Sequence, residues 1–180
     1  MDKSNIYALF GVVGPLIAYI SIIVSIAYSP WFSWKRSALS DLGHSVNSGV
    51  ASIFNLGLLL AGFLIIVYAL TVFRRHAKYT SICLIASGFM LQLVATFDEV
   101  YGFFHFAVSV LFFVLIGVTS IVYIIERKSY LASLMFIINL GSWILYGMRI
   151  YRAGVAVPET ISSVAVVLWI VVSAVRILSE

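Results

Sequence analysis

Charged side chains are scarce in this chain, and their scarcity excludes an ordinary soluble protein. Asp, Glu, Lys and Arg make up 10% of the 180 residues, whereas hydrophobic residues make up 63% and the mean hydropathy is +1.12. A soluble domain needs a polar surface that this composition does not supply. A bilayer solvates apolar side chains, and helices satisfy their own backbone hydrogen bonds inside it. We therefore expect an integral membrane protein.

Cysteine and extramembrane sequence are nearly absent as well. The single cysteine, Cys83, excludes an intrachain disulfide and makes a thiolate metal cluster implausible. The longest stretch between apolar runs, Pro30–Gly49, is too short for a soluble domain. A nucleic-acid partner would need a basic surface outside the membrane, so the net charge of +4 does not indicate one.

Six apolar runs are long enough to cross a bilayer. A helix rises about 1.5 Å per residue, so a hydrocarbon core about 30 Å thick requires roughly 20 apolar residues. The runs predict an all-α polytopic bundle of six transmembrane helices, forming one transmembrane domain over residues 1–180. The first run is too long for a signal peptide, so we expect it to be retained. The expected spans are Ile6–Ser29, Val50–Phe73, Thr80–Phe97, Phe103–Ile125, Tyr130–Ile150 and Glu159–Leu178.

Basic residues are distributed unequally between the two sides of such a bundle. The side that holds both termini has seven Lys and Arg residues, and the opposite side has four. Because cytoplasmic loops are enriched in Lys and Arg, we expect both termini to be cytoplasmic, in a multi-pass protein of the plasma membrane. The seven are Lys3, Arg74, Arg75, Lys78, Arg127, Lys128 and Arg176, and the four are Lys35, Arg36, Arg149 and Arg152.

Acidic residues and histidines gather in the loops on the extracytoplasmic side of this topology. The first loop, SALSDLGHSVNSG, carries Asp41 and His44, and the third, FDEVYGFFHF, carries Asp98, Glu99 and His105. The short third loop confines Asp98 and His105 to one helix mouth, and the first loop is long enough to fold over it. We therefore expect these five residues to converge as candidate catalytic residues.

Carboxylates and imidazoles support two kinds of chemistry at such a mouth. They are ligands of catalytic zinc, and they perform general acid–base catalysis. The spacings H-E-x-x-H, H-x-x-x-H and G-x-S-x-G are absent. Asp41 or Ser40 would also serve simply to cap a short helix. Binding or organising lipid through this mouth is our main hypothesis, and a membrane-embedded lipid hydrolase that uses the five residues, with or without a divalent metal such as zinc, is the alternative.

Two arginines and three amides complete the candidate residues. Arg149 and Arg152 are three apart and would clamp a lipid headgroup phosphate if the fifth helix continues, although we favour the simpler explanation that they snorkel toward the interface. Asn55, Gln92 and Asn139 are too few to line an aqueous pore and are typical of bonds between helices. A small transporter remains a further alternative, although no internal repeat is apparent. The expected partners are membrane lipids, and the oligomeric state is open.

The segment ALSDLGHSVNSGVASIFNLGLLLAGFLII, Ala38–Ile66, resembles a family of small six-helix prokaryotic membrane proteins of unknown function. Members have an apolar helix, then SDLG, then FN-x-G opening the second helix, and a short acidic turn before a His-bearing fourth helix, similar to Asp98–His105 here. This resemblance implies the fold and the topology.

More distantly, the arrangement resembles the Frag1/DRAM/Sfk1 group of six-helix proteins, which is linked to lipid-anchor remodelling and membrane lipid organisation. Alkaline ceramidase-like hydrolases also invite comparison, but they carry an H-x-x-x-H pair and seven spans, which this chain lacks.

Overall fold

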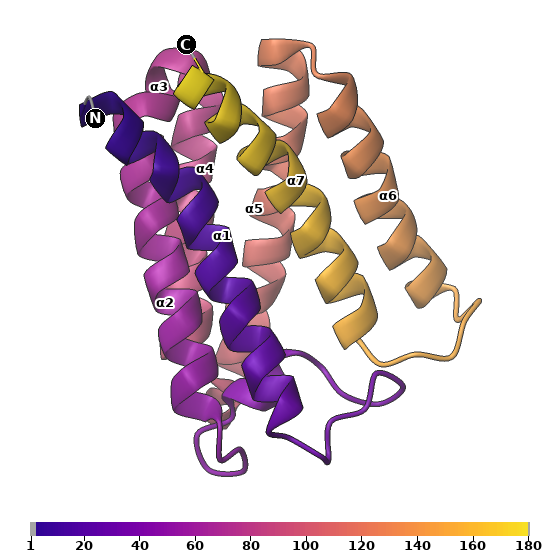
Figure 1. The fold of residues 1–180 in the computed structure, drawn as a ribbon. Coiled ribbons are helices and arrows are strands. Elements are labelled where there is room, and N and C mark those ends of the chain that lie inside the picture. Colours follow the sequence, from indigo (N-terminus) through magenta and orange to yellow (C-terminus); the bar gives the residue numbers. More distant parts are fainter. Residues whose placement is uncertain (1–2, 180) are drawn as a thin grey trace.

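The computed structural model describes residues 3–179 as a bundle of long helices (Figure 1). Six helical segments are long and apolar enough to cross a membrane, and the described residues contain no strand. The predicted all-α fold with six membrane-length helices is therefore confirmed. The six segments are Asn5–Ala27, Ala51–His76, Lys78–Thr96, Phe103–Arg127, Tyr130–Gly147 and Ala156–Ser179.

The connections between the helices carry two 3-10 turns, one in the long first loop and one in the short third loop. In chain order the elements are α1 (Lys3–Ala27), the 3-10 turn η1 (Ser40–Gly43), α2 (Ala51–Tyr68), the π-helical turn η2 (Ala69–Phe73), α3 (Arg74–His76), α4 (Lys78–Thr96), the 3-10 turn η3 (Glu99–Tyr101), α5 (Phe103–Arg127), α6 (Tyr130–Gly147) and α7 (Ala156–Ser179).

The second crossing runs through α2, η2 and α3 without a break. The π turn widens the helix and displaces its backbone hydrogen bonds. Ser81 on α4 compensates, because its hydroxyl donates to the carbonyl oxygen of Ala69 at 2.8 Å. The crossing therefore ends at His76, three residues beyond the Phe73 expected from hydropathy.

The helices pack in an order that leaves α6 at one edge. α1 lies against α2 and α7, α2 packs on α4, and α4 packs on α5. α6 packs mainly against α7 and less against α5. α1 begins and α7 ends at the same end of the bundle, and the long first loop lies at the opposite end (Figure 1).

Two glycines set the approach of α2 to α4. A Cβ added at Gly62 would lie 2.7 Å from the carbonyl oxygen of Gly88, and one added at Gly88 would lie 3.0 Å from that of Gly62. The two backbones therefore touch at a point where any larger residue would force them apart. Such close contact is how helices gain packing energy in lipid, where the hydrophobic effect does not drive their association.

The N-terminus of α4 is capped by a residue from another helix. Ala77, which precedes α4, has no side chain that could accept a hydrogen bond from the first turn. Glu126, near the end of α5, accepts instead from the backbone N–H groups of Tyr79 and Thr80 at 3.1 and 2.8 Å and from the Thr80 hydroxyl at 2.7 Å. A negative charge at a helix N-terminus is favourable, so this contact joins the ends of α4 and α5.

Candidate functional site

The first and third loops are fastened to each other at one end of the bundle. The Ser40 hydroxyl donates to Oε1 of Glu99 at 2.7 Å, and the Ser45 backbone N–H donates to Oδ2 of Asp98 at 3.1 Å. We call this end, made by residues 37–48, 97–105 and 155–159, the mouth. The first loop can fold over the third because both loops carry polar side chains that bond backbone groups.

Asp98 acts as a structural acceptor within the mouth. Its Oδ1 accepts from the Val100 N–H at 2.9 Å and so caps η3, while its Oδ2 holds the first loop. Burial of Asp98 acts to raise the pKa of its carboxyl. The hydrogen bonds from Ser45 and Val100 and the proximity of His44 outweigh burial, so the pKa is lowered.

His105 is buried in the first turn of α5, where it is 7% exposed. Its Nδ1 lies 2.6 Å from the carbonyl oxygen of Phe97, and its Nε2 lies 3.3 Å from the hydroxyl of Ser109, one helical turn further on. Because a carbonyl only accepts, Nδ1 carries a proton. In the neutral ring Nε2 then has no proton and can accept the one from Ser109. This tautomer, protonated on Nδ1, is the one that a general base needs.

Asp41 and Glu99 lie close enough to influence each other. Oδ2 of Asp41 accepts from the Ala38 N–H at 3.0 Å, so this carboxylate caps its own loop. Burial raises the pKa of Glu99, the hydrogen bond from Ser40 opposes that rise, and the neighbouring charge of Asp41 adds to it, so the net shift is upward. The Glu99 carboxyl therefore gains a proton more readily than an ordinary exposed glutamate as pH falls.

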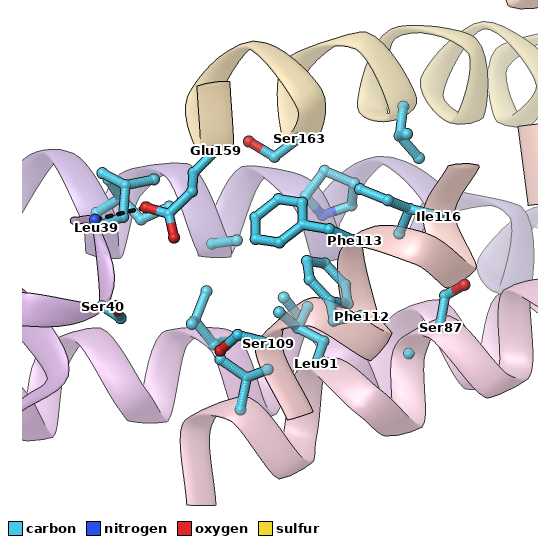
Figure 2. A pocket seen from close by; sticks show the side chains of 18 of the residues that line it. Leu39, Ser40, Ser87, Leu91, Ser109, Phe112, Phe113, Ile116, Glu159 and Ser163 are labelled. Atoms are coloured by element: carbon cyan, nitrogen blue, oxygen red, sulfur yellow. Dashed lines mark hydrogen bonds between the residues drawn. The ribbon is translucent and has the colours of Figure 1, made fainter. Parts of the chain in front are cut away.

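Glu159 is a mouth residue to which sequence reasoning assigned no role. It lies in the first turn of α7, is 8% exposed, and accepts from the Leu39 N–H through Oε2 at 2.7 Å. Figure 2 shows the side chain reaching from α7 toward Leu39. The available signal was an acidic residue placed after Pro158 at the start of an otherwise apolar run.

The other predicted residues have different surroundings. His44 is half-buried, and its Nε2 lies 3.0 Å from the side-chain amide of Asn47. Arg149 and Arg152 are exposed in the connection between α6 and α7 and do not line the cavity or the groove described below. The expected continuation of the fifth helix does not occur, since α6 ends at Gly147 and Arg149 has a left-handed backbone with φ of 56°.

Two hollows meet at the mouth. An interior cavity of about 150 Å³ lies between the helices, and most of its lining is apolar (Figure 2). A larger groove of about 850 Å³ runs along α5 and α6. Both are lined by Ser40, His105, Ser109, Phe113 and Glu159.

The mouth does not offer a ready set of metal ligands. Within residues 3–179, no group of three or more His, Cys, Asp or Glu side chains is arranged to hold a metal ion. Both nitrogens of His105 and both oxygens of Asp98 are already engaged. A zinc site of the kind expected as an alternative would need these bonds to be broken first.

Comparison with known proteins gives a family and no activity. The family model described as "Protein of unknown function (DUF998)" matches residues 12–176, a range that includes the SDLG and FNLG segments. No curated protein and no solved structure matches the chain.

Proposed function

The chain belongs to the DUF998 family of proteins of unknown function, and from this premise we propose that it binds membrane lipid. The acyl chain would lie in the groove between α5 and α6, and the headgroup would lie at the mouth. The groove is the observation that supports this proposal, because it joins an apolar wall to a polar end.

One stripe of α5 forms the floor of the groove. Its apolar side chains recur every three or four residues, which places them on one face of the helix. Many of them are not covered by other parts of the protein: Phe106 is 61% exposed and Val114 is 54% exposed. From Phe106 to Ile121 the stripe rises about 22 Å, roughly three quarters of a bilayer core of about 30 Å. Apart from His105 and Ser109, the α5 lining is Phe106, Val110, Phe113, Val114, Gly117, Val118 and Ile121, and the α6 lining is Phe136, Asn139, Leu140 and Trp143.

Ionisable groups line the groove only near its mouth end, and the side chain of Asn139, halfway along α6, already accepts a hydrogen bond from Ser162. Glu99, His105 and Ser109 come from the third loop and the first two turns of α5, and Ser40 and Glu159 come from the first loop and α7. An amphiphile needs this arrangement, with hydrogen-bonding groups at the membrane interface and a largely apolar path below them.

Gly117 provides a direct test of lipid binding. It lines the groove, and a Cβ added there would meet no atom within 4 Å, so the larger side chain of Gly117→Leu has room to start from and would occupy the groove. Gly141 on α6 is equally open but does not line the groove, which makes Gly141→Leu the matched control. Both changes should favour their helices by roughly 0.5–1 kcal/mol.

Native mass spectrometry of detergent-purified protein would report the retained lipid. We expect the wild type and Gly141→Leu to keep bound lipid and Gly117→Leu to lose most of it. Retention that is equal in all three proteins, or a wild type that keeps none, would refute lipid binding in the groove.

A lipid hydrolase is the second candidate, because Ser109 and His105 form a serine–histidine pair inside the groove. Nε2 of His105 would take the Ser109 proton, and the Phe97 carbonyl would hold the ring in the required tautomer. A fluorophosphonate probe should then label Ser109 in the wild type but not in His105→Gln. Absence of labelling in the wild type would leave lipid binding as the sole candidate.

A further inference from the structure

We infer that the mouth selects lipids whose headgroup carries a primary ammonium group. This inference rests on the proposed lipid groove and adds to it the charge and the hydrogen-bonding character of the headgroup. It is carried by the side chains at the polar end of the groove and by one unpaired carboxylate oxygen of the largely buried Glu159.

The charged lining of the groove has a single sign. Glu99 and Glu159 contribute carboxylates, His44 and His105 contribute imidazoles, and no Lys or Arg from the described part of the chain lines it. An anionic phosphate headgroup would face two carboxylates with no fixed cation beside it, which disfavours that headgroup. An ammonium group carries three N–H donors and a positive charge, and thus complements the same surface.

Glu159 has unused acceptor capacity at the centre of this surface. More than nine tenths of the residue is buried, and Oε2 takes the Leu39 N–H, but no described residue donates to Oε1. The residue lines both the interior cavity and the groove. A buried carboxylate without a counter-charge is costly, and a bound ammonium would supply both the charge and the missing donor.

A primary ammonium fits better than a quaternary one. The charged acceptors that line the groove are the carboxylates of Glu99 and Glu159, and a carboxylate oxygen is best satisfied by an N–H or O–H donor. A trimethylammonium group has no such donor and is usually recognised by aromatic faces. Phosphatidylethanolamine therefore represents the favoured class, phosphatidylcholine the quaternary class and phosphatidylglycerol the anionic class.

Competition among these three lipids tests the inference. Detergent-purified full-length protein is offered equal amounts of the three with identical acyl chains, and the bound species are resolved by native mass spectrometry. We expect the wild type to prefer phosphatidylethanolamine over each of the others by about tenfold, the effect of one charge-assisted hydrogen bond. Glu159→Gln, whose amide oxygen can still accept from Leu39, should reduce the preference to below twofold.

Two further variants keep the result interpretable. Glu126→Gln removes a carboxylate at the opposite end of α5, outside the groove lining, and should keep the full preference. If Glu159→Gln does not fold, Glu99→Gln removes the second carboxylate of the groove and should weaken the preference in the same direction.

The possible outcomes separate the two levels of the proposal. Lipid bound without headgroup preference, or with preference for phosphatidylglycerol or phosphatidylcholine, would overturn the ammonium inference and leave lipid binding intact. A wild type that binds none of the three would overturn both. Displacement of phosphatidylethanolamine by millimolar water-soluble phosphoethanolamine would show a site for the free headgroup, and would overturn the assignment to a lipid.

Discussion

The Glu159 carboxylate on α7 accepts a hydrogen bond of 2.7 Å from the backbone N–H of Leu39, 120 residues earlier in the chain. The first loop is thereby tied to α7, while Ser40 and Ser45 tie it to the third loop through Glu99 and Asp98. A segment that spans much of the mouth is thus held from two sides, and its order depends on three acidic residues.

Truncation of Glu159 should loosen the first loop around Leu39, although the bond from the Ala156 N–H to the Ser37 carbonyl still joins the loop to α7. Glu159→Ala leaves the Leu39 N–H buried without an acceptor, at a cost of about 1–3 kcal/mol. Hydrogen–deuterium exchange at Leu39 and its neighbours should accelerate at least severalfold, whereas Glu159→Gln should keep near wild-type protection because its amide oxygen can still accept. Equal exchange in the two variants would show that the bond does not order the loop.

Asp98→Asn should destabilise the contact between the first and third loops. The carboxylate accepts from Ser45 with one oxygen and from Val100 with the other, whereas an asparagine must turn its NH₂ toward one of these N–H donors. The free energy of unfolding should fall by about 1–3 kcal/mol. Thermal unfolding in detergent measures the change.

Asp41→Asn is the matched control for Asp98→Asn. Asp41 accepts only the Ala38 N–H among the described backbone groups, and an asparagine oxygen can replace that acceptor. Its melting temperature should stay close to that of the wild type. A comparable loss in both variants would indicate a general effect of charge rather than the two-sided bond of Asp98.

The two acidic residues of the third loop should give stability opposite dependences on pH. Burial and the charge of Asp41 raise the pKa of Glu99 above its ordinary 4.5 despite the Ser40 bond, so the stability gained from the protonated form is present below pH 4.5 and is lost as pH rises through the folded-state pKa. The pKa of Asp98 is lowered below 3.8 because its hydrogen bonds outweigh burial, so its contribution is present above pH 3.8 and is lost on further acidification.

Glu99→Gln isolates the first of these dependences. Glutamine does not titrate, so the melting temperature of the variant relative to the wild type should increase as pH is raised from 4.5 to neutrality. A series of thermal unfolding curves over this range provides the measurement. A relative melting temperature that is constant or decreases with pH would contradict the raised pKa.

The long helices were predictable from the sequence because bilayer thickness imposes a length on every crossing. The helix end at His76 was placed too early, since a π turn such as Ala69–Phe73 has no hydropathy signature. The end of α6 at Gly147 was missed for a related reason, because the apolar run continues past the last helical residue.

The site was only partly predictable, because its contacts join residues distant in sequence. The hydroxyl-rich first loop and the acidic third loop were recognisable, but the pairing of Ser40 with Glu99 depends on how the loops fold. The groove could not be predicted from the sequence for a different reason. α5 is apolar around much of its circumference, so periodicity does not reveal which stripe lacks a protein neighbour.

Glu126 should stabilise the bundle by capping the N-terminus of α4. Glu126→Ala removes the acceptor for two backbone N–H groups and one hydroxyl at a helix N-terminus, and should lower the free energy of unfolding by about 1–2 kcal/mol. Glu126→Gln retains one strong acceptor and should lose less. Thermal unfolding of both variants in the same detergent would rank them, and a smaller loss in the alanine variant would refute the capping role.

The mouth should face the extracytoplasmic side of the plasma membrane. The opposite end carries the greater number of Lys and Arg residues, which are retained in the cytoplasm during insertion. Val46 at the mouth is 76% exposed and Arg75 at the other end is also exposed, so single cysteines at these positions are accessible to reagents. In a Cys83→Ala background, an impermeant maleimide added to intact cells should label Val46→Cys but not Arg75→Cys, and permeabilisation should allow both to react. The reverse pattern would invert the topology and place the groove mouth at the cytoplasmic leaflet.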